Sequence, residues 1–470
     1  MAATSGGPTT VERKQATLQM FNTWSQRAQL LYRWLLLHNC QRSSITCRWS
    51  QSSHVHPDIP GGANTVLSSE REIDREWPNT LTLCSEPCIQ DEEALRQSHL
   101  DDSGKALQAK IHAQTWPKSH ESVVKRIVHP GQVNRIREVG APGHESRVVT
   151  HTDAPELFVW NVSSQPARSP QSTQADTWRP VPSVADLVLT GHTAAAEYAL
   201  ATSSSLEPCI ASGGQDTRVL LWNLRDHDSG SAPASKRQKV SASSRSQAKA
   251  PQLAARIQLE GHKGNINDLR FKQDSSEQLV SAADDGQVHV WDVRSTTQPC
   301  STIGPEGASR GVLCVAWSPH EEHTVACGLD SGEVHLYDLR KLEPVGDGAQ
   351  HRAKLRLAWH TASCENLDWD PLHRDFLASS AWDGRLCIWD LGQSRTDPVP
   401  ETVSGGGRST RHGPDRPEPP PQLRLEHLGN QDQVSDFHWH PTSPHTMLSV
   451  SDTNRGSMLQ LWQARPQIFG

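Results

Sequence analysis

The sequence has few of the features that mark membrane, secreted and metal-binding proteins. Its most apolar run, from Leu30 to Leu37, is interrupted by Arg33 and is too short to span a bilayer. The N-terminus is polar and has no apolar segment followed by a small-residue cleavage site, so we expect no signal peptide. The ten cysteines include no CxxC pair, and the Cys84/Cys88 spacing has no second half-site, so no zinc site is predicted.

Strong net charge and catalytic motifs are also missing. A formal net charge of −7 over 470 residues is modest, so we expect neither general attraction to nucleic acid nor sequence-specific binding of it. The chain has no phosphate-binding loop, nucleophile elbow or metal constellation. We therefore predict a protein that is not an enzyme and that needs neither metal nor cofactor.

What the sequence does contain is a repeated apolar strand that ends in Trp-Asp or a near variant. The six copies are Val159-Trp160-Asn161, Leu221-Trp222-Asn223, Val290-Trp291-Asp292, Leu336-Tyr337-Asp338, Ile388-Trp389-Asp390 and Leu461-Trp462-Gln463. In three of them a His, after Gly or Trp, lies about 30 residues upstream: His192, His262 and His360. This pattern is typical of the WD40 blade of a β-propeller. One blade cannot bury its own faces, so the blades must stack around an axis.

The same three units share a set of polar residues. An Asp lies six residues before the Trp, at Asp216, Asp285 and Asp383. We expect this Asp in the turn between the last two inner strands, where it accepts a hydrogen bond from the His. Ser281 or Ser379 then links the His to the indole N–H. A His/Ser/Asp set could also form a hydrolase triad, but its recurrence favours a structural role.

The predicted fold class is all-β: a seven-bladed WD40 β-propeller with an N-terminal α-helix and long inserted loops. Six repeats are clear, and residues 43–90 are interpreted as a degenerate additional one. We expect Ile45–Trp49 to pair into the last blade and close the ring. The predicted segments are a disordered N-terminus (1–16), an amphipathic helix (17–42), the propeller (43–464) with a disordered basic insertion (226–252) and a Pro/Gly-rich loop (392–422), and a C-terminal tail (465–470).

Several specific segments resemble one WD40 family. They are Leu31-Tyr32-Arg33-Trp34, Pro78-Asn79-Thr80-Leu81, His129-Pro130-Gly131-Gln132-Val133-Asn134-Arg135-Ile136-Arg137, Thr150-His151-Thr152-Asp153 and Val434-Ser435-Asp436-Phe437-His438-Trp439. On these, the chain resembles the retinoblastoma-associated histone-binding WD40 proteins, the chromatin assembly factor small subunit or MSI type, and within them the plant FVE-type branch. The resemblance implies a nuclear scaffold in transcriptional repression. Its implied partners are histone H4, histone H3 as a second histone, and histone deacetylase, Polycomb or chromatin assembly subunits.

The resemblance also implies two binding sites. A groove on the side of the ring would take the first helix of histone H4, and its residues are Leu30, Leu31, Trp34, Leu35, Glu418, Pro420, Pro421 and Leu423. A site on top of the ring would take a basic tail such as that of histone H3, and its residues are Asn134, Glu197, Tyr198 and Glu365. Gln132, Asn267 and Ser363 stand where the family often has Glu, so this acidic collar is thinner. Lys236, Arg237 and Lys239 resemble a short nuclear import signal.

Two other functions stay open. Asp292 with Arg294, and Asp338 with Arg340, resemble the WDxR box of substrate receptors for cullin-4-type ubiquitin ligases, which implies a ligase adaptor as partner. Some ribosome-assembly WD40 proteins share the N-terminal helix, but they typically add a long acidic N-terminal tract that this sequence lacks.

Overall fold

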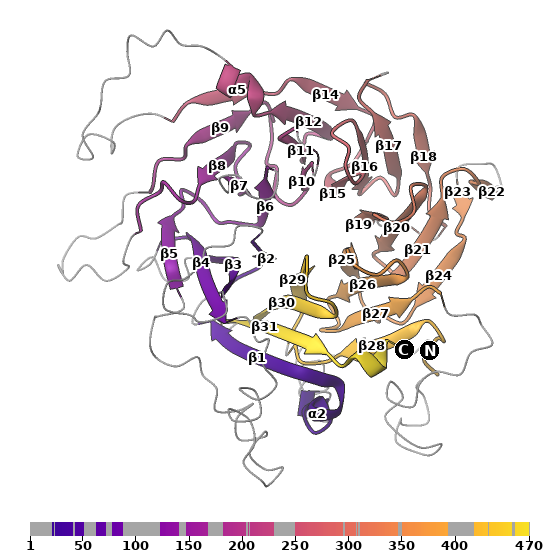
Figure 1. Ribbon diagram of the computed structural model, residues 1–470. Helices are drawn as coiled ribbons and strands as arrows, with labels where there is room; N and C mark the ends of the chain where they lie inside the picture. The colour runs from indigo at the N-terminus through magenta and orange to yellow at the C-terminus, as the bar shows by residue number, and fades with distance from the viewer. Residues whose placement is uncertain are drawn as a thin grey trace, which may run out of the picture.

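Seven sheets of four or five strands stand around one axis (Figure 1). The structure is a computed structural model. It describes residues 21–469 except positions 23, 41–42, 51–62, 72–77, 88–122, 141–146, 168–181, 204, 206, 230–249, 295–296, 307, 309–310, 346–349, 393–417, 431 and 454–455. The predicted residues 1–16 of the N-terminus, Lys236, Arg237 and Lys239 therefore lie outside the described part of the chain.

Each sheet is one blade, and its strands follow one another outward from the axis. Blades one to four are β2 (Cys47–Trp49), β3 (Ala63–Glu70), β4 (Thr80–Pro87), β5 (Val123–Val128); β6 (Arg135–Val139), β7 (Arg147–His151), β8 (Leu157–Asn161), β9 (Leu187–Thr190); β10 (Leu200–Thr202), β11 (Cys209–Gly213), β12 (Arg218–Asn223), β14 (Ile257–Glu260); and β15 (Ile266–Phe271), β16 (Gln278–Ala283), β17 (Val288–Asp292), β18 (Ser301–Ile303). Blades five to seven are β19 (Val312–Trp317), β20 (Thr324–Leu329), β21 (Glu333–Asp338), β24 (Leu355–Ala358); β25 (Cys364–Trp369), β26 (Phe376–Ala381), β27 (Leu386–Asp390), β28 (Leu423–His427); and β29 (Val434–Trp439), β30 (Thr446–Thr453), β31 (Gly456–Ala464), β1 (Tyr32–Cys40).

Smaller elements decorate the ring. They are the helices α2 (Ala28–Leu31) and α5 (Arg225–Ser229), the hairpin β22 (Glu343–Val345) and β23 (Gln350–Arg352), strand β13 (Gln252–Ala254) and a 3-10 turn at Pro466–Ile468. No helix in the described ranges is long and apolar enough to cross a membrane.

The ring is closed. The innermost strands contact one another in the order β2, β6, β10, β15, β19, β25 and β29, and β29 contacts β2. The predicted seven-bladed propeller is confirmed, and the weak segment 43–90 supplies three strands of the first blade.

The hydrophobic core is divided into seven clusters, one between each pair of neighbouring blades. The repeated aromatic residue of each blade packs onto the blade before it: Trp291 of blade four lies with residues of blade three, and Tyr337 of blade five with residues of blade four. Blade one has no such aromatic residue and places Cys84 in the cluster that it shares with blade seven. This substitution explains why its repeat is hard to see in the sequence.

The predicted polar network is present in three blades. In blade four, His262 Nδ1 lies 3.0 Å from Asp285 and its Nε2 lies 2.6 Å from Ser281 Oγ, which accepts the Trp291 indole N–H at 2.8 Å. The equivalent contacts in blade six join His360, Asp383, Ser379 and Trp389. Blade three has His192, Asp216 and Ser212, but there the Trp222 indole donates to the Thr190 carbonyl instead. The recurrence ties the set to blade structure.

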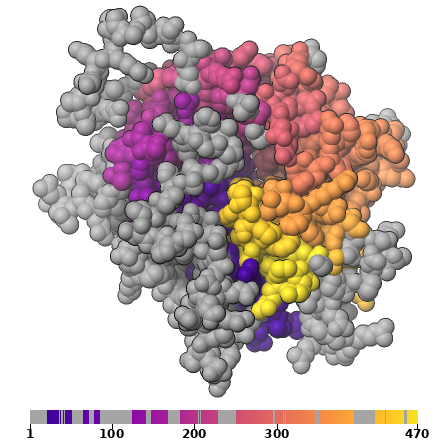
Figure 2. Space-filling model, in the orientation of Figure 1, coloured from indigo at the N-terminus to yellow at the C-terminus, as the bar shows by residue number. Residues whose placement is uncertain are grey.

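The prediction of the closing strand was wrong. Ile45–Trp49 contributes β2, the innermost strand of blade one, and the strand that completes blade seven is β1. Strand β1 runs antiparallel to β31 from the Tyr32/Ala464 pair to the Cys40/Ser457 pair. Figures 1 and 2 show the N-terminal segment in indigo against the C-terminal blade in yellow. The two ends of the chain thus share one sheet.

The predicted helix over residues 17–42 was wrong for Tyr32–Cys40, while residues 17–20 and 41–42 lie outside the described part of the chain. Residues 21–22, 24–25 and 28–31 are helical, and the chain then becomes the extended strand β1. The open edge of β31 offers a row of unpaired backbone groups, and pairing with it outweighs the helical pattern of the segment. Tyr32 anchors this strand, because its hydroxyl lies 2.6 Å from His427 Nδ1 and accepts the Trp24 indole N–H.

Both boundaries of the predicted insertion differ from the prediction. The segment 226–252 begins in helix α5 and ends in β13, which pairs parallel to β9 of blade two. The C-terminal tail is packed, since Ile468 is buried and the Phe469 ring stacks on His445 at 3.9 Å.

The shared hydroxyl of blade four gives a test of the network. Replacing Ser281 by Ala should lower the free energy of unfolding by about 1–3 kcal/mol, because it leaves the buried Trp291 N–H and His262 Nε2 without a partner. Urea denaturation of the full chain measures this. The exposed Ser163 provides the control, and Ser163→Ala should stay within about 0.5 kcal/mol of the wild type. Equal values for the two variants would contradict a stabilising network.

Candidate functional site

One face of the ring carries the loops that enter the innermost strands and the turns with Asp216, Asp285 and Asp383. These loops and turns must lie on the same face, because each His is hydrogen-bonded to the turn Asp of its own blade. We call this the top face. All four residues predicted for the basic-tail site lie there, in the loops before β6 and β10 or near the start of β25.

On this face, four blades each have a side-chain hydrogen bond between the beginning of the innermost strand and the turn that joins the second and third strands. The pairs are Asn134 with Asp153 at 2.8 Å, Glu197 with Gln215 at 2.9 Å, Asn267 with Asp284 at 2.8 Å, and Glu365 with Trp382. Three of the turn residues, Gln215, Asp284 and Trp382, directly precede the repeated turn Asp. The position directly before the turn Asp is therefore a signal for such residues, and the sequence prediction did not use it.

The four predicted residues differ in what they offer a ligand. Asn134 is buried, and its amide N–H is used by Asp153, so it positions the loop. Glu197 is half-buried, and Tyr198 is exposed. Burial raises the pKa of Glu365 to about 7, although Arg135 and the hydrogen bond from Trp382 act in the opposite direction. The Glu365 carboxyl therefore changes its charge near neutral pH.

Aromatic surface adjoins these acidic groups. Trp382 is 59% exposed and Tyr198 is 41% exposed, which are high values for aromatic residues. Exposed carboxylates also lie on this face at Asp153 and Asp284. Acidic groups beside open aromatic rings suit Lys and Arg side chains, which bind both by charge and by cation–π contact.

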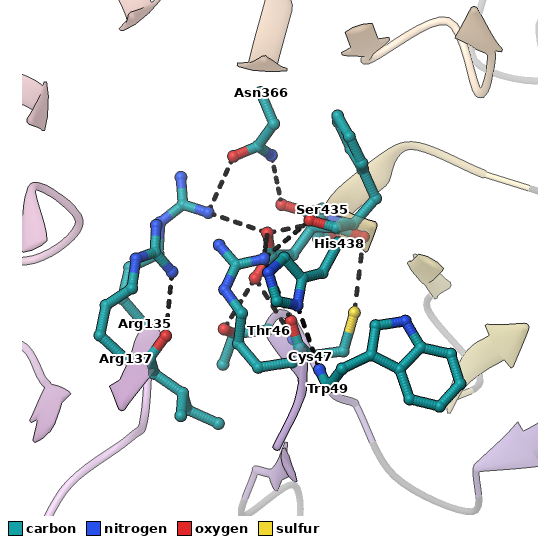
Figure 3. A network of polar contacts seen from close by, with 12 residues as sticks. Thr46, Cys47, Trp49, Arg135, Arg137, Asn366, Ser435 and His438 are labelled. Atoms are coloured by element: carbon teal, nitrogen blue, oxygen red, sulfur yellow. Dashed lines mark hydrogen bonds and ion pairs between the residues drawn. The ribbon is translucent and has the colours of Figure 1, made fainter. Parts of the chain in front are cut away.

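Below this face, polar side chains cross the central channel (Figure 3). Arg135 of blade two donates to Asn366 of blade six at 2.9 Å and lies 3.3 Å from Asp436 of blade seven. Asn366 in turn donates to the Ser435 carbonyl at 2.8 Å. The two contacts of Arg135 join blades that are not neighbours, so they tie distant parts of the ring together under the top face.

Asp436 is the centre of this network. It also pairs with Arg48 at 3.2 Å and accepts the Thr46 hydroxyl at 2.8 Å. Burial alone would raise the pKa of Asp436, but Arg48 and Arg135 hold it below the usual value. The carboxylate therefore stays ionised in the ring interior. The sequence prediction did not include this network, since nothing in one repeat shows which residues of other blades face the axis.

The side-groove prediction is partly corrected by the structure. Phe21 and Trp24 of the N-terminal segment pack with Leu425, and the Trp24 and His427 rings lie 5.3 Å apart, so the segment lies along β28. Leu31 and Leu35 pack in the same cluster, while Leu30 is 70% exposed.

Two of the groove residues do not belong in it. Leu423 is 1% exposed and lies in the core between blades five and six, so it cannot contact a partner. Trp34 packs with the cluster between blades seven and one, because adjacent residues of a strand point to opposite faces, whereas Leu35 faces the helix. Glu418 is exposed, and Pro420 and Pro421 are half-buried, just before β28.

The two Asp/Arg pairs occupy equivalent positions at the ends of β17 and β21. Arg294 makes two bonds to Asp292, at 2.9 and 2.5 Å, and Arg340 makes two to Asp338, at 2.9 and 2.7 Å. The arginine side chains stay 59% and 62% exposed. The hydrogen bonds from Arg294 and Arg340 lower the pKa values of Asp292 and Asp338, so both pairs are ionised.

Within the described part of the chain, one group has the spacing of metal ligands: Asp370, His373 and His445. Asp370 already accepts the Leu372 backbone N–H at 2.7 Å and lies 2.9 Å from His373 Nδ1. The two His rings are stacked at 4.5 Å with an interplanar angle of 14°. A metal ion lies near the ring plane of each His that binds it, and two stacked, nearly parallel planes cannot both contain one ion. We assign the group to stabilising the turn after β25.

The fold and these surfaces define a class, a WD40-repeat propeller that acts as a scaffold. The family model described as WD domain, G-beta repeat matches residues 255–292, 298–338 and 354–390. The chain is also 30% identical over 461 residues to the WD-40 repeat-containing protein MSI4 of Arabidopsis thaliana, a match that covers 96% of this chain and 82% of that protein. The chain belongs to the MSI-type family of WD-40 repeat proteins.

Proposed function

We propose that this chain is a non-enzymatic, histone-binding scaffold subunit of nuclear chromatin complexes of the histone deacetylase, Polycomb or chromatin assembly type, acting in transcriptional repression. The observation that carries the proposal is the exposed side chain of Leu30 at the predicted side groove. Leu30 exposes 70% of its surface on a segment that is anchored through Trp24 and Tyr32, next to the strand that Glu418 and the two prolines precede. An exposed apolar side chain on a fixed segment suits an amphipathic helix such as the first helix of histone H4, and the exposed Glu418 would favour a basic one.

The top face supports a second histone contact. Glu197 and Glu365, with Tyr198 and Trp382, form an acidic and aromatic surface. We assign it to a Lys/Arg-rich tail such as that of histone H3. Because Glu365 is only partly ionised near neutral pH, the affinity of this site depends on pH. The proposed nuclear location rests on Lys236, Arg237 and Lys239 as import signal.

A specific observation also favours the ubiquitin-ligase function as a second role. Arg294 and Arg340 are exposed, are held by bidentate contacts to an Asp, and lie at matching positions of blades four and five. Two oriented guanidinium groups on neighbouring blades can bind an acidic surface of a ligase adaptor.

Removing the exposed apolar side chain tests the groove. Leu30→Ser should weaken binding of a histone H4 first-helix peptide about tenfold, or about 1.4 kcal/mol, without changing the Tm. Isothermal titration calorimetry measures the Kd. Leu372, 43% exposed in a turn of blade six, is the matched control, and Leu372→Ser should bind as the wild type does. An unchanged Kd for Leu30→Ser would rule out this groove.

Titration of Glu365 tests the top face. Between pH 6 and pH 8 its raised pKa takes the carboxyl from mostly protonated to mostly ionised, so wild-type affinity for a histone H3 tail peptide should rise with pH. Glu365→Gln should bind as weakly at pH 8 as the wild type does at pH 6. Fluorescence anisotropy of a labelled peptide gives both curves. If the Glu365→Gln variant keeps the full pH dependence of the affinity, that dependence belongs to another group.

The ligase role predicts that the chain loses binding to the adaptor when both arginines are removed. The double variant Arg294→Ala/Arg340→Ala should lose co-purification with a cullin-4 ligase adaptor and keep histone H4 binding. Arg374→Ala is the control, because Arg374 is similarly exposed at 65% and also pairs with a carboxylate, that of Glu321. Equal adaptor recovery from the double variant and the control would exclude this role.

A further inference from the structure

Arg71 places a positive charge on the top face, among acidic side chains. It directly follows β3, in the turn that joins the second and third strands of blade one, and 23% of its side chain is exposed. Strand β3 runs antiparallel to the innermost strand β2, so it ends on the face where β2 begins, which is the top face. A ligand on this face can therefore contact the guanidinium group of Arg71.

Residues of both neighbouring blades hold this guanidinium group. The side-chain amide of Gln132, in the loop before β6 of blade two, lies 3.1 Å from Arg71 Nε and 2.9 Å from Arg71 Nη2. Because a guanidinium group only donates hydrogen bonds, the amide oxygen faces Arg71 and accepts both. The opposite orientation would give one bond to Asn134 Oδ1, at 3.0 Å, and would direct an N–H group at the Arg71 donors. From blade seven, Asp452 Oδ2 lies 3.8 Å from Arg71 Nη1, so Arg71 is held between an amide oxygen and a carboxylate.

Arg71 covers acceptors that a basic residue of a ligand would use. The Ser43 hydroxyl donates to Asp452 Oδ1 at 2.7 Å, while Asp452 Oδ2 faces Arg71. The Asp452 side chain is 17% exposed, so this carboxylate is partly open to solvent. Carboxylate oxygens bind the ammonium and guanidinium groups of Lys and Arg through charge-assisted hydrogen bonds, and amide oxygens accept from the same groups. Without the Arg71 guanidinium group, both acceptors would be available to a ligand.

The charge of Arg71 also reaches a residue predicted to bind the tail. Burial and the charge of Glu197 raise the pKa of Tyr198, whereas the charges of Arg71 and Arg135 act in the opposite direction. Arg135 lies deeper, with 8% of its side chain exposed. Further acidic side chains on this face are Asp153, Glu197, Asp284, Asp330, Glu365 and Asp432. Blades three to six therefore each carry a carboxylate on the top face, whereas blade one presents a cation.

We propose that Arg71 occupies part of the tail site on the top face and excludes Lys and Arg side chains of the ligand from the area around Gln132 and Asp452. Arg71 thereby adds specificity to the tail site proposed above, on which this inference rests. The basic residues of the bound tail then lie over the carboxylates of blades three to six, and the part of the tail over Arg71 is uncharged or acidic. An interface rejects a wrong partner by bringing like charges together, so Arg71 selects tails whose positive charges are grouped at one end.

Removing the charge of Arg71 tests the exclusion. Arg71→Met keeps the apolar stem and uncovers Asp452 and the Gln132 amide oxygen, so the Kd of the full chain for a histone H3 tail peptide should fall about fivefold. The affinity should also depend more steeply on salt, because the variant pairs with one more charge of the peptide. Arg71→Lys keeps the charge and should bind as the wild type does. Fluorescence anisotropy of a labelled peptide over a series of salt concentrations measures both quantities.

Lys263 provides the matched control, because it is an exposed cation of the same face, in the loop before β15 of blade four. Lys263→Met removes one positive charge away from Gln132 and Asp452, so it should change the Kd by less than about twofold. The double variant Arg71→Met/Asp452→Asn should lose most of the gain of Arg71→Met, because the uncovered side chain of residue 452 is then neutral. A thermal unfolding curve checks that each variant is folded.

A purely structural role of Arg71 predicts the opposite result. Arg71→Met would then lower the Tm and leave the peptide affinity unchanged or weaker, and this outcome would overturn the inference while the tail site remains. Equal gains for Arg71→Met and Lys263→Met would also overturn it, since they would reflect net charge alone. Failure of both the wild type and Arg71→Met to bind the peptide would instead overturn the tail site and, with it, this inference.

Discussion

The pairing of β1 with β31 is the constraint on which the rest of the molecule depends. A propeller has no central hydrophobic core, and every apolar cluster here lies between two neighbouring blades. A blade therefore buries its second face only if the ring closes. Nine N-terminal residues complete the last blade, and Tyr32 fastens them to His427 and Trp24. Closure also covers the edge of β31, which would otherwise be open for another chain to pair with.

Closure also gives the proposed binding surfaces a fixed shape. The segment before β1 must lie along β28, since Trp24 and Tyr32 contact His427 on that strand. This placement fixes the position of Leu30, two residues before β1. On the top face, hydrogen bonds between strand beginnings and turns orient the acidic and aromatic residues blade by blade. A ligand there meets a surface that is already ordered, so little conformational entropy is lost on binding.

The proposed surfaces are separate, which is what a scaffold requires. The groove lies on the side of blades six and seven, the acidic and aromatic surface lies on top, and the Asp/Arg pairs end the third strands of blades four and five. Partners on such distant surfaces need not compete. The channel network below the top face connects blades two, six and seven.

By itself the sequence determined the blades. The Trp-Asp ends and the His, Ser and Asp spacing are properties of one repeat, so they predicted the ring, the number of blades and the network around Ser281 and Ser379. Tertiary structure decided whatever depends on a partner from another part of the chain. Tyr32–Cys40 has a helical pattern, but it meets the open edge of β31, near the other end of the sequence, and becomes a strand. Leu423 resembles a groove residue yet is buried by blade five. Arg135, Arg137 and Asp436 come from strands at opposite ends of the sequence, and only closure of the ring places their charges in one channel, where low polarity makes each unpaired group costly.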